Sequence, residues 1–461
     1  MTLIVTSEYT LQRIQPPALP HATTQYSPQY QDELNNILRL YFNRLQNILG
    51  QLMATDTALP ITFPAAATDA FGRLRVSQPY TLFDSQNRYA ADNQFATSTS
   101  GTGSTTYNAN QASVSMAVTA GGVGSVVRQT YRNMMYQPGK GLLVLATFVM
   151  DTSNSTGLTQ KVGYFNAQNG VFFSKNDGTK SFTLRSYTSG SVDDTRTVTQ
   201  ANWNGDKLDG TGASGYTLDL SHPQILWMDF EWLGVGSVRC GFIINGEYIV
   251  CNTFNTANSY GTTVYMTTAI LPVRYEIVST SAVAASMTQV CSSVMSEGGF
   301  EETSIEHVAR RTSIFTNIDT AANFYPIVSI RLASTALGAV VLPNNIQFQP
   351  TTLQNYEIAL IKNPVLTGAS WTAQPDDANV EYDVSATAIA TAGQIVQTAY
   401  IANSGGGGQA TTVSPTGFNW DEQIGVSLTS VSDIYTLGVR TISGATKGDG
   451  VGSISFYDLT Q

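Results

Sequence analysis

From residue 67 onward the chain consists of short apolar runs separated by turn residues. Within each run, large apolar or β-branched side chains recur at every second position, and Gly, Asn, Asp and Ser lie between the runs. A period of two places successive side chains on opposite faces of an extended strand. So many short strands predict a mainly β protein made of β-sandwiches of the jelly-roll type. The clearest runs are VVRQTYRNM, GLLVLATFVM, GVFFSK, SFTLRSYT, QILWMDFEW, VRCGFII and EYIVCNTF.

One turn within this region can be predicted in detail. The segment VRCGFIINGEYIV holds two apolar runs joined by Asn245 and Gly246. Both residue types accept the positive φ angles that the central positions of a type I′ turn require. The segment therefore predicts a tight β-hairpin.

The first 66 residues follow a different pattern. Residues 1 to 30 hold several prolines among polar residues, which predicts an extended arm without a core of its own. A helix is predicted next, with Ser27 as its N-cap and Pro28 at its first position. Its apolar residues follow a 4-3-4-3-4 spacing and so line one stripe: Leu34, Leu38, Tyr41, Leu45, Ile48 and Leu52.

Two interpretations of this stripe are open. The helix could lie on its own domain, or it could join other subunits. Ile37, Leu40, Phe42 and Leu49 widen the apolar surface beyond the seam of a two-stranded coiled coil, which suits burial against several partners. An apolar helix at one end of a β protein favours a role in assembly.

The segment SEGGFEETSIEHVARRT, residues 296 to 312, is more polar and more charged than its surroundings. A second series of strand-like runs follows it, with FYPIVSIRL and YTLGVRTI among them. We therefore predict an arm and helix for docking or oligomerisation over residues 1–66, a lectin-like jelly-roll sandwich over 67–311, and a C-terminal β-sandwich over 312–461.

Composition excludes several classes of function. The net charge of −10 argues against a nucleic-acid partner, because phosphate binding requires clustered Lys and Arg. Three cysteines, Cys240, Cys251 and Cys291, are too few for a disulfide framework, and buried free thiols are favoured over a Cys240–Cys251 bridge. No zinc-ligand spacing, secretory signal or apolar run of about 18 residues occurs, so we expect no metal, no cofactor, no membrane insertion and synthesis in the cytoplasm.

Two carboxylates stand two positions apart in ILWMDFEWLG, residues 225 to 234. Strand alternation puts Trp227, Asp229 and Glu231 on the face opposite the core residues. The stretch resembles the catalytic strand Glu-x-Asp-x-Glu of the concanavalin-like β-glucanase family, where the first Glu is the nucleophile. Trp227 occupies that position here, and a retaining mechanism needs two carboxyl groups about 5 Å apart, so we predict no catalytic residues. Two interpretations remain: an ordinary strand surface, or a glycan-binding face that also includes Trp203.

A glycine-rich loop, NWNGDKLDGTGASG, carries Asp206 and Asp209. Two carboxylates in such a loop could bind calcium, but the ordered acidic spacing of a calcium loop is missing. A tight surface turn is favoured, and calcium binding stays open.

One longer stretch carries a family resemblance. DAFGRLRVSQPYTLFD, residues 69 to 84, resembles the opening of a family of tailed-bacteriophage virion structural proteins, in which it follows an attachment segment and precedes a lectin-like β-sandwich. Later parts, from DKLDGTGASG to FIINGE and in FYPIVSIRL and YTLGVRTI, resemble the same proteins. The resemblance implies a tail, baseplate, fibre or capsid-surface component and brings no catalytic residues. Within it, Arg73 and Arg75 alternate with Leu74 and Val76, so a strand could bury one pair and place the other against carboxylates or another subunit. A plain strand at the entry to the domain is the favoured interpretation.

These observations together predict a non-enzymatic structural component of a phage virion that assembles through its arm and helix. Its partners would be copies of itself, a trimer being the first expectation, and other virion proteins. The alternative is a host-glycan-binding or polysaccharide-depolymerising tail protein whose binding face consists of Trp203, Trp227, Asp229 and Glu231.

Overall fold

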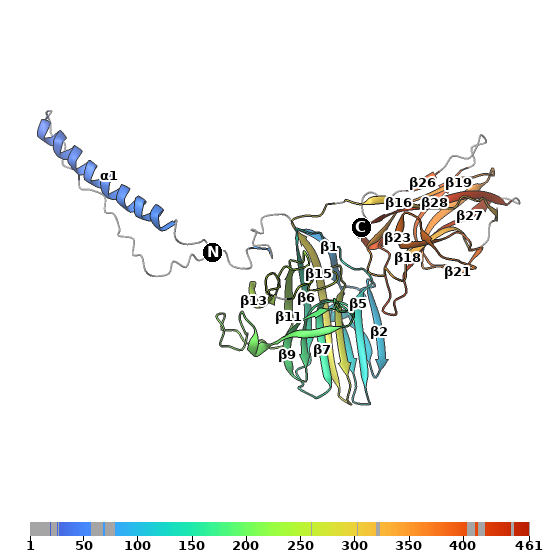
Figure 1. The fold of residues 1–461 in the computed structure, drawn as a ribbon, viewed down its shortest axis with the longest axis horizontal. Helices are drawn as coiled ribbons and strands as arrows, with labels where there is room; N and C mark the ends of the chain where they lie inside the picture. Colours follow the sequence, from blue (N-terminus) through green and yellow to red (C-terminus); the bar gives the residue numbers. More distant parts are fainter. Residues whose placement is uncertain are drawn as a thin grey trace. The chain divides into compact units, whose positions relative to one another are not determined.

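The computed structural model describes residues 19, 25, 27–56, 68–69, 79–259, 261–301, 303–319, 323–402, 411–413, 420–443 and 447–460, the side chains of 47–56, 411–413 and 443 excepted. Two compact units make up the chain, Met1–Pro64 and Ala65–Gln461. The first contains one helix and the second contains the strands (Figure 1).

Helix α1 extends from Pro28 to Asp56. Its N-terminus is capped as predicted, because the Tyr30 amide donates to Ser27 Oγ over 3.4 Å. The helix is continuous (Figure 1) and passes through every position of the predicted stripe.

The first β-sandwich consists of two antiparallel sheets. In the described part the first sheet has eight strands: β13 (Glu247–Phe254), β12 (Val238–Ile244), β11 (Gln224–Phe230), β6 (Gly141–Met150), β15 (Ala285–Glu297), β4 (Ser113–Val118) and β3 (Ser104–Asn108), with β1 (Tyr80–Gln86) also beside β15. The second has seven: β10 (Asp193–Thr199), β9 (Thr179–Ser186), β8 (Gly170–Asn176), β7 (Leu158–Phe165), β14 (Val273–Ser279), β5 (Gly124–Thr130) and β2 (Phe95–Gly101).

The core of this sandwich lies between the two sheets and follows the alternation in the sequence. Val144 and Phe148 of β6 belong to the same buried cluster as Val162 of β7 and Phe173 of β8. Phe173 and Phe148 approach to 6.1 Å between ring centroids across the sheets. The mainly β, lectin-like sandwich expected from the sequence is confirmed.

A second, smaller sandwich follows (orange to red in Figure 1). One sheet holds β16 (Ile305–Arg310), β28 (Gly448–Asp458), β19 (Val341–Pro350), β26 (Thr411–Val413) and β17 (Phe315–Ile318). The other holds β22 (Thr372–Gln374), β23 (Asp377–Asp383), β18 (Tyr325–Leu332), β27 (Ile434–Ser443), β20 (Asn355–Lys362) and β25 (Gln394–Ile401), and β21 (Val365–Thr367) pairs with β24 (Ala388–Thr391). Its core is a separate cluster that includes Ile330 and Ile454.

The boundary between the sandwiches lies earlier than the sequence predicted. Strand β16 pairs with β28 from Ile305 to Arg310, so these residues belong to the second sandwich. The predicted division at residue 311 was therefore wrong, and the connection falls between Glu297 and Ile305. Charged residues suggested a linker, but Glu306 and Arg310 occupy the exposed positions of an edge strand.

Two local predictions are confirmed. Asn245 and Gly246 connect β12 to β13 with φ angles of 53° and 81°. All three cysteines are free thiols, and Cys240 and Cys251 lie in the core of the first sandwich. Burial raises the pKa of both thiols, so they behave as apolar side chains.

Candidate functional site

The apolar stripe of α1 remains partly exposed. Among the helix residues whose side chains are described, from Pro28 to Gln46, none is buried. The stripe residues Leu34, Leu38, Tyr41 and Leu45 are half-buried. Outside the stripe, Leu40 and Phe42 are 60% and 58% exposed. Ile48 and Leu52 lie on the helix, but their side chains are outside the described part.

The expected sugar-stacking residue Trp227 is buried on strand β11, with no exposed surface. Its indole Nε1 donates to the carbonyl of Ile249 over 3.2 Å, and its ring meets Tyr248 edge-on at 5.5 Å between centroids. Gly241 makes this possible, because a Cβ at that position would lie 2.9 Å from Nε1. The ring therefore packs within the protein and offers no platform to a ligand.

Asp229 is also buried, in an ion pair with Arg239 of the neighbouring strand. Arg239 also donates to the carbonyl of Thr68 over 2.6 Å, so residues 68 and 69 lie against the outer face of the eight-stranded sheet. Asp69 and Glu297 lie near Asp229, because all three side chains border Gly141. A Cβ at Gly141 would lie 3.4 Å from the Asp69 side chain, 3.5 Å from that of Glu297 and 3.7 Å from that of Asp229. A distant part of the chain thus covers the carboxylate that we expected to face solvent.

The other two predicted glycan-binding residues do not form a binding face either. Strand β11 ends at Phe230, and the Glu231 carboxylate turns back to accept hydrogen bonds from Ser237 at 3.1 and 3.3 Å. Trp203 lies in the core, 4.9 Å from the ring of Phe182 between centroids. The predicted face of Trp203, Trp227, Asp229 and Glu231 is therefore wrong, because burial removes its aromatic rings and Asp229 from solvent.

Asp206 and Asp209 hold their own loop together. Asp206 accepts hydrogen bonds from the amides of Leu208 and Ser214 at 2.8 and 2.7 Å. Asp209 accepts from the hydroxyl and amide of Thr211, and these bonds lower the pKa of the Asp209 carboxyl. Within the described residues no group of three or more His, Cys, Asp or Glu side chains could hold a metal ion. The arrangement is that of the tight turn favoured by the sequence.

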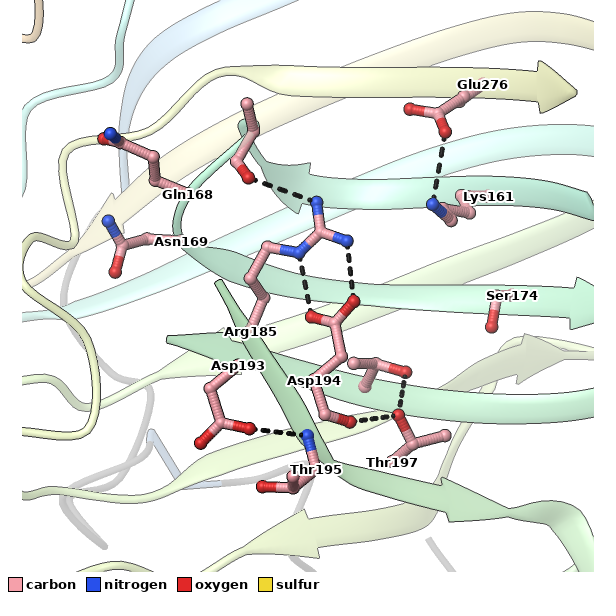
Figure 2. Close-up of polar contacts among 12 residues, drawn as sticks. Lys161, Gln168, Asn169, Ser174, Arg185, Asp193, Asp194, Thr195, Thr197 and Glu276 are labelled. Atoms are coloured by element: carbon pink, nitrogen blue, oxygen red, sulfur yellow. Dashed lines mark hydrogen bonds and ion pairs between the residues drawn. The ribbon is translucent and has the colours of Figure 1, made fainter. Parts of the chain in front are cut away.

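The outer face of the seven-stranded sheet is polar and was not singled out from the sequence (Figure 2). Hydroxyl groups of neighbouring strands bond directly to one another: Ser174 with Ser181, and Thr183 with Thr197, each at 2.9 Å. Alternating Ser and Thr in SFTLRSYT and DDTRTVT is the signal that could have found them.

Ion pairs flank these hydroxyls. Arg185 forms a bidentate ion pair with the Asp194 carboxylate, with N–O distances of 2.9 and 2.7 Å (Figure 2). Glu276 forms ion pairs with Lys161 at 3.2 Å and with Arg274 at 2.6 Å. Burial raises the pKa of Glu276, but the two cations outweigh it, so the pKa lies below its usual value.

Two aromatic rings support the charges of this face. The rings of Phe165 and Phe172 pack at a tilt of 41° with centroids 4.6 Å apart, and both are almost fully buried. The cations of Lys161, Arg185 and Arg274 lie 5.2 to 5.5 Å from the ring centroids, within the range of cation–π attraction. The charges of this face already have partners, so a ligand would have to displace them.

Residues 70–78, which form most of the DAFGRLRVSQPYTLFD motif, lie outside the described residues. They include Arg73 and Arg75, so the predicted contacts of these two arginines with carboxylates or another subunit stay a prediction.

Across the described helices, none is long and apolar enough to cross a bilayer.

Comparisons with known proteins give only distant similarities. No protein-family model and no curated protein matches the chain. Among solved structures, the cellulose-induced protein Cip1 matches at a TM-score of 0.30 and 13% identity, over 46% of this chain and 96% of that one. The carbohydrate recognition domain of Emp47p matches at 0.30 and 10%, over 48% and 98%. Arcelin-5, a lectin-like defense protein from Phaseolus vulgaris, matches at 0.31 and 9%, over 49% and 100%. Scores this low carry no argument about function.

Proposed function

We propose that this chain is a non-enzymatic structural component of a particle and that it assembles through its N-terminal helix. The observation that carries the proposal is the apolar stripe of α1, whose residues Leu34, Leu38, Tyr41 and Leu45 stay half-exposed while the β-sandwiches bury their own apolar faces. Contiguous exposed apolar surface of this kind marks a site of association.

The breadth of the apolar surface favours more than two copies. Ile37 and Phe42 lie on either side of the stripe; Ile37 is half-buried and Phe42 is 58% exposed. A two-stranded coiled coil would bury the stripe and leave both of them in water. A closed ring of three helices shelters a wider surface, so a homotrimer remains the expected state.

The particle we propose is a tailed-bacteriophage virion, on the resemblance of DAFGRLRVSQPYTLFD to virion structural proteins. The distribution of carboxylates supports a non-enzymatic role. Asp229 is engaged with Arg239, Glu231 with Ser237 and Asp206 with its own loop, so none of these predicted residues forms an open acid/base pair.

Light scattering coupled to size exclusion tests the assembly. In the full chain, Leu38→Glu combined with Leu45→Glu places two charges in the stripe, and we expect a mass that falls from the oligomer to the monomer. The matched control combines Asn36→Glu with Asn43→Glu on the opposite side of the helix, adds the same charge, and should keep the oligomer. An unchanged mass in the stripe variant would refute assembly through α1.

Mass spectrometry of purified tailed-phage particles tests the location. Peptides from both sandwiches should be present at a constant ratio to known virion proteins. Their absence from intact particles, with abundance in the soluble fraction of lysed cells, would contradict the virion assignment.

A further inference from the structure

The sequence holds three Asn-Gly dipeptides, and each can undergo a spontaneous modification. The backbone nitrogen of Gly attacks the side-chain carbonyl carbon of Asn, the bond to Nδ2 breaks, and ammonia leaves behind a succinimide ring. Water then opens this ring to aspartate or isoaspartate, so the net change consumes one water and releases one ammonia. Glycine favours the attack because it has no side chain to shield the nitrogen and rotates freely. The three pairs are Asn169-Gly170, Asn204-Gly205 and Asn245-Gly246.

The attack needs an Asn side chain that can turn toward the glycine nitrogen, and the fold prevents this at Asn169. The residue is buried, with 1% of its surface exposed. Its side-chain oxygen accepts from the amides of Tyr187 at 3.2 Å and Thr267 at 3.1 Å. Its Nδ2 donates to Thr267 Oγ1 at 2.7 Å. Burial and hydrogen bonding therefore protect Asn169 together.

Asn204 is exposed, but hydrogen bonds hold both of its reacting groups. Its side-chain oxygen accepts from the Thr253 amide and its Nδ2 donates to the Thr253 carbonyl, each at 2.8 Å. The Gly205 amide, which would be the nucleophile, donates to the carbonyl of Cys251 over 2.9 Å. Asn204 is therefore accessible to water but held away from attack.

Asn245 differs from both. It and Gly246 are exposed at the tip of the hairpin between β12 and β13. Strand pairing closes at Ile244 and Glu247, so the Gly246 amide lies outside the ladder. Within the described part of the chain, the Asn245 side chain makes one hydrogen bond, from Nδ2 to the Tyr216 hydroxyl at 3.0 Å. No described atom other than those of its chain neighbours lies within 4 Å of a Cβ position on Gly246.

Cyclisation requires the turn to leave its left-handed conformation, in which Asn245 has a φ of 53°. Rotation of the two turn residues breaks the bond to Tyr216 and leaves the strand ladder intact. Openings of this size are among the least costly motions of a fold. We propose that Asn245 is a site of spontaneous deamidation, with water as its only co-reactant, while hydrogen bonds preserve Asn169 and Asn204. This modification goes beyond the assembly function and does not rest on it.

The product changes the turn in charge and in length. Either acid adds a negative charge two positions before Glu247 and removes Nδ2 as a donor to Tyr216. Isoaspartate also carries the main chain through its side chain, which adds a methylene to a two-residue turn. Turn length sets the register of a hairpin, so the isoaspartate form disturbs the pairing of β12 with β13.

Peptide mapping by mass spectrometry on the full chain tests the proposal. The folded protein is incubated at mildly alkaline pH in heavy-oxygen water, which labels only the acids formed during the incubation. The same chain in concentrated urea gives the reference rate of each dipeptide. Asn245 should react in the fold within about tenfold of its unfolded rate, whereas Asn169 and Asn204 should be slowed far more. Asn245 that stays intact in the fold, or folded-state rates that are equal at Asn204 and Asn245, would overturn the proposal.

Gly246→Ala tests the route, because its methyl group shields the attacking nitrogen. Deamidation of Asn245 should slow about tenfold. The matched control is Gly139→Ala, since Gly139 is exposed, has a φ of 86° and an equally open Cβ position, and so meets the same strain elsewhere in the chain. This control should leave the rate at Asn245 unchanged. Equal rates in the wild-type chain and Gly246→Ala would show that Asn245 does not cyclise onto Gly246 and would refute the proposal.

Discussion

Helix α1 and strand β11 carry comparable apolar side chains but differ in what shelters them. On β11, every residue from Gln224 to Phe230 except Ile225 is buried, on the outer face as well as in the core. On α1, no described side chain is buried. The chain buries the strand within its own fold, whereas the described side chains of the helix keep part of their surface exposed.

The difference shows where function can reside. Trp227 and Asp229 have the chemistry of a binding site, but Gly241, Tyr248 and Arg239 convert them into structure. Leu38 and Leu45 have no special chemistry, yet their partial exposure makes them available. Accessibility, more than residue type, separates the two regions.

The largest expected effect tests the structural role of β11. Trp227→Ala empties a fully buried site and should lower the free energy of unfolding by about 3–5 kcal/mol. Ile225→Ala, on the same strand at 37% exposure, is the control and should cost far less. Urea unfolding followed by tyrosine and tryptophan fluorescence measures both. A small loss for Trp227→Ala would mean that its ring is not packed as described.

The second effect concerns the covered carboxylate. Arg239→Ala leaves Asp229 buried without its ion-pair partner and should cost about 3 kcal/mol. Arg239→Ala combined with Asp229→Leu removes the charge as well and should recover most of the loss. A double variant as unstable as the single one would show that Asp229 is not held chiefly by Arg239.

A smaller effect is pH-dependent. Because Glu276 has a lowered pKa in the fold, its contribution to stability is present above its unfolded pKa and is lost as the pH falls through its folded pKa. Glu276→Gln should therefore cost about 1–2 kcal/mol at pH 7 and less in acid. Melting temperatures from pH 7 to pH 3 measure this, with exposed Glu247→Gln as the control. A loss that is constant with pH would contradict the ion-pair assignment.

The smallest effect is local. Gly246 has a φ of 81° and nothing near its Cβ position, so Gly246→Ala meets only conformational strain. We expect a loss of about 1 kcal/mol. Chemical denaturation measures it, and a stabilised variant would show that the turn does not adopt positive φ in solution.

The sequence predicts what depends on neighbours along the chain. Strand alternation, the Asn245-Gly246 turn and the Ser27 cap follow from local chemistry and are confirmed. It could not predict that Thr68 would reach Arg239 across 171 positions, and hence that the outer face of β11 is covered. The pairing of β16 with β28 was missed for the same reason, because its partner lies at the end of the chain.

The contact between the two sandwiches was also beyond prediction from sequence. Tyr131 and Val426 are far apart along the chain, and neither lies in a recognisable motif. Only the packing of one sandwich against the other lets the Val426 amide donate to the Tyr131 carbonyl over 3.0 Å. The polar outer face of the seven-stranded sheet, in contrast, could have been predicted from the alternating Ser and Thr residues in the sequence.

Hydroxyl-radical footprinting at increasing protein concentration tests the contrast between helix and strand most directly. Leu38 and Tyr41 should be labelled in dilute protein and become protected as the chains associate, whereas Trp227 should stay unlabelled at every concentration. Labelling of Leu38 and Tyr41 that is the same in dilute and concentrated protein would contradict assembly through the helix.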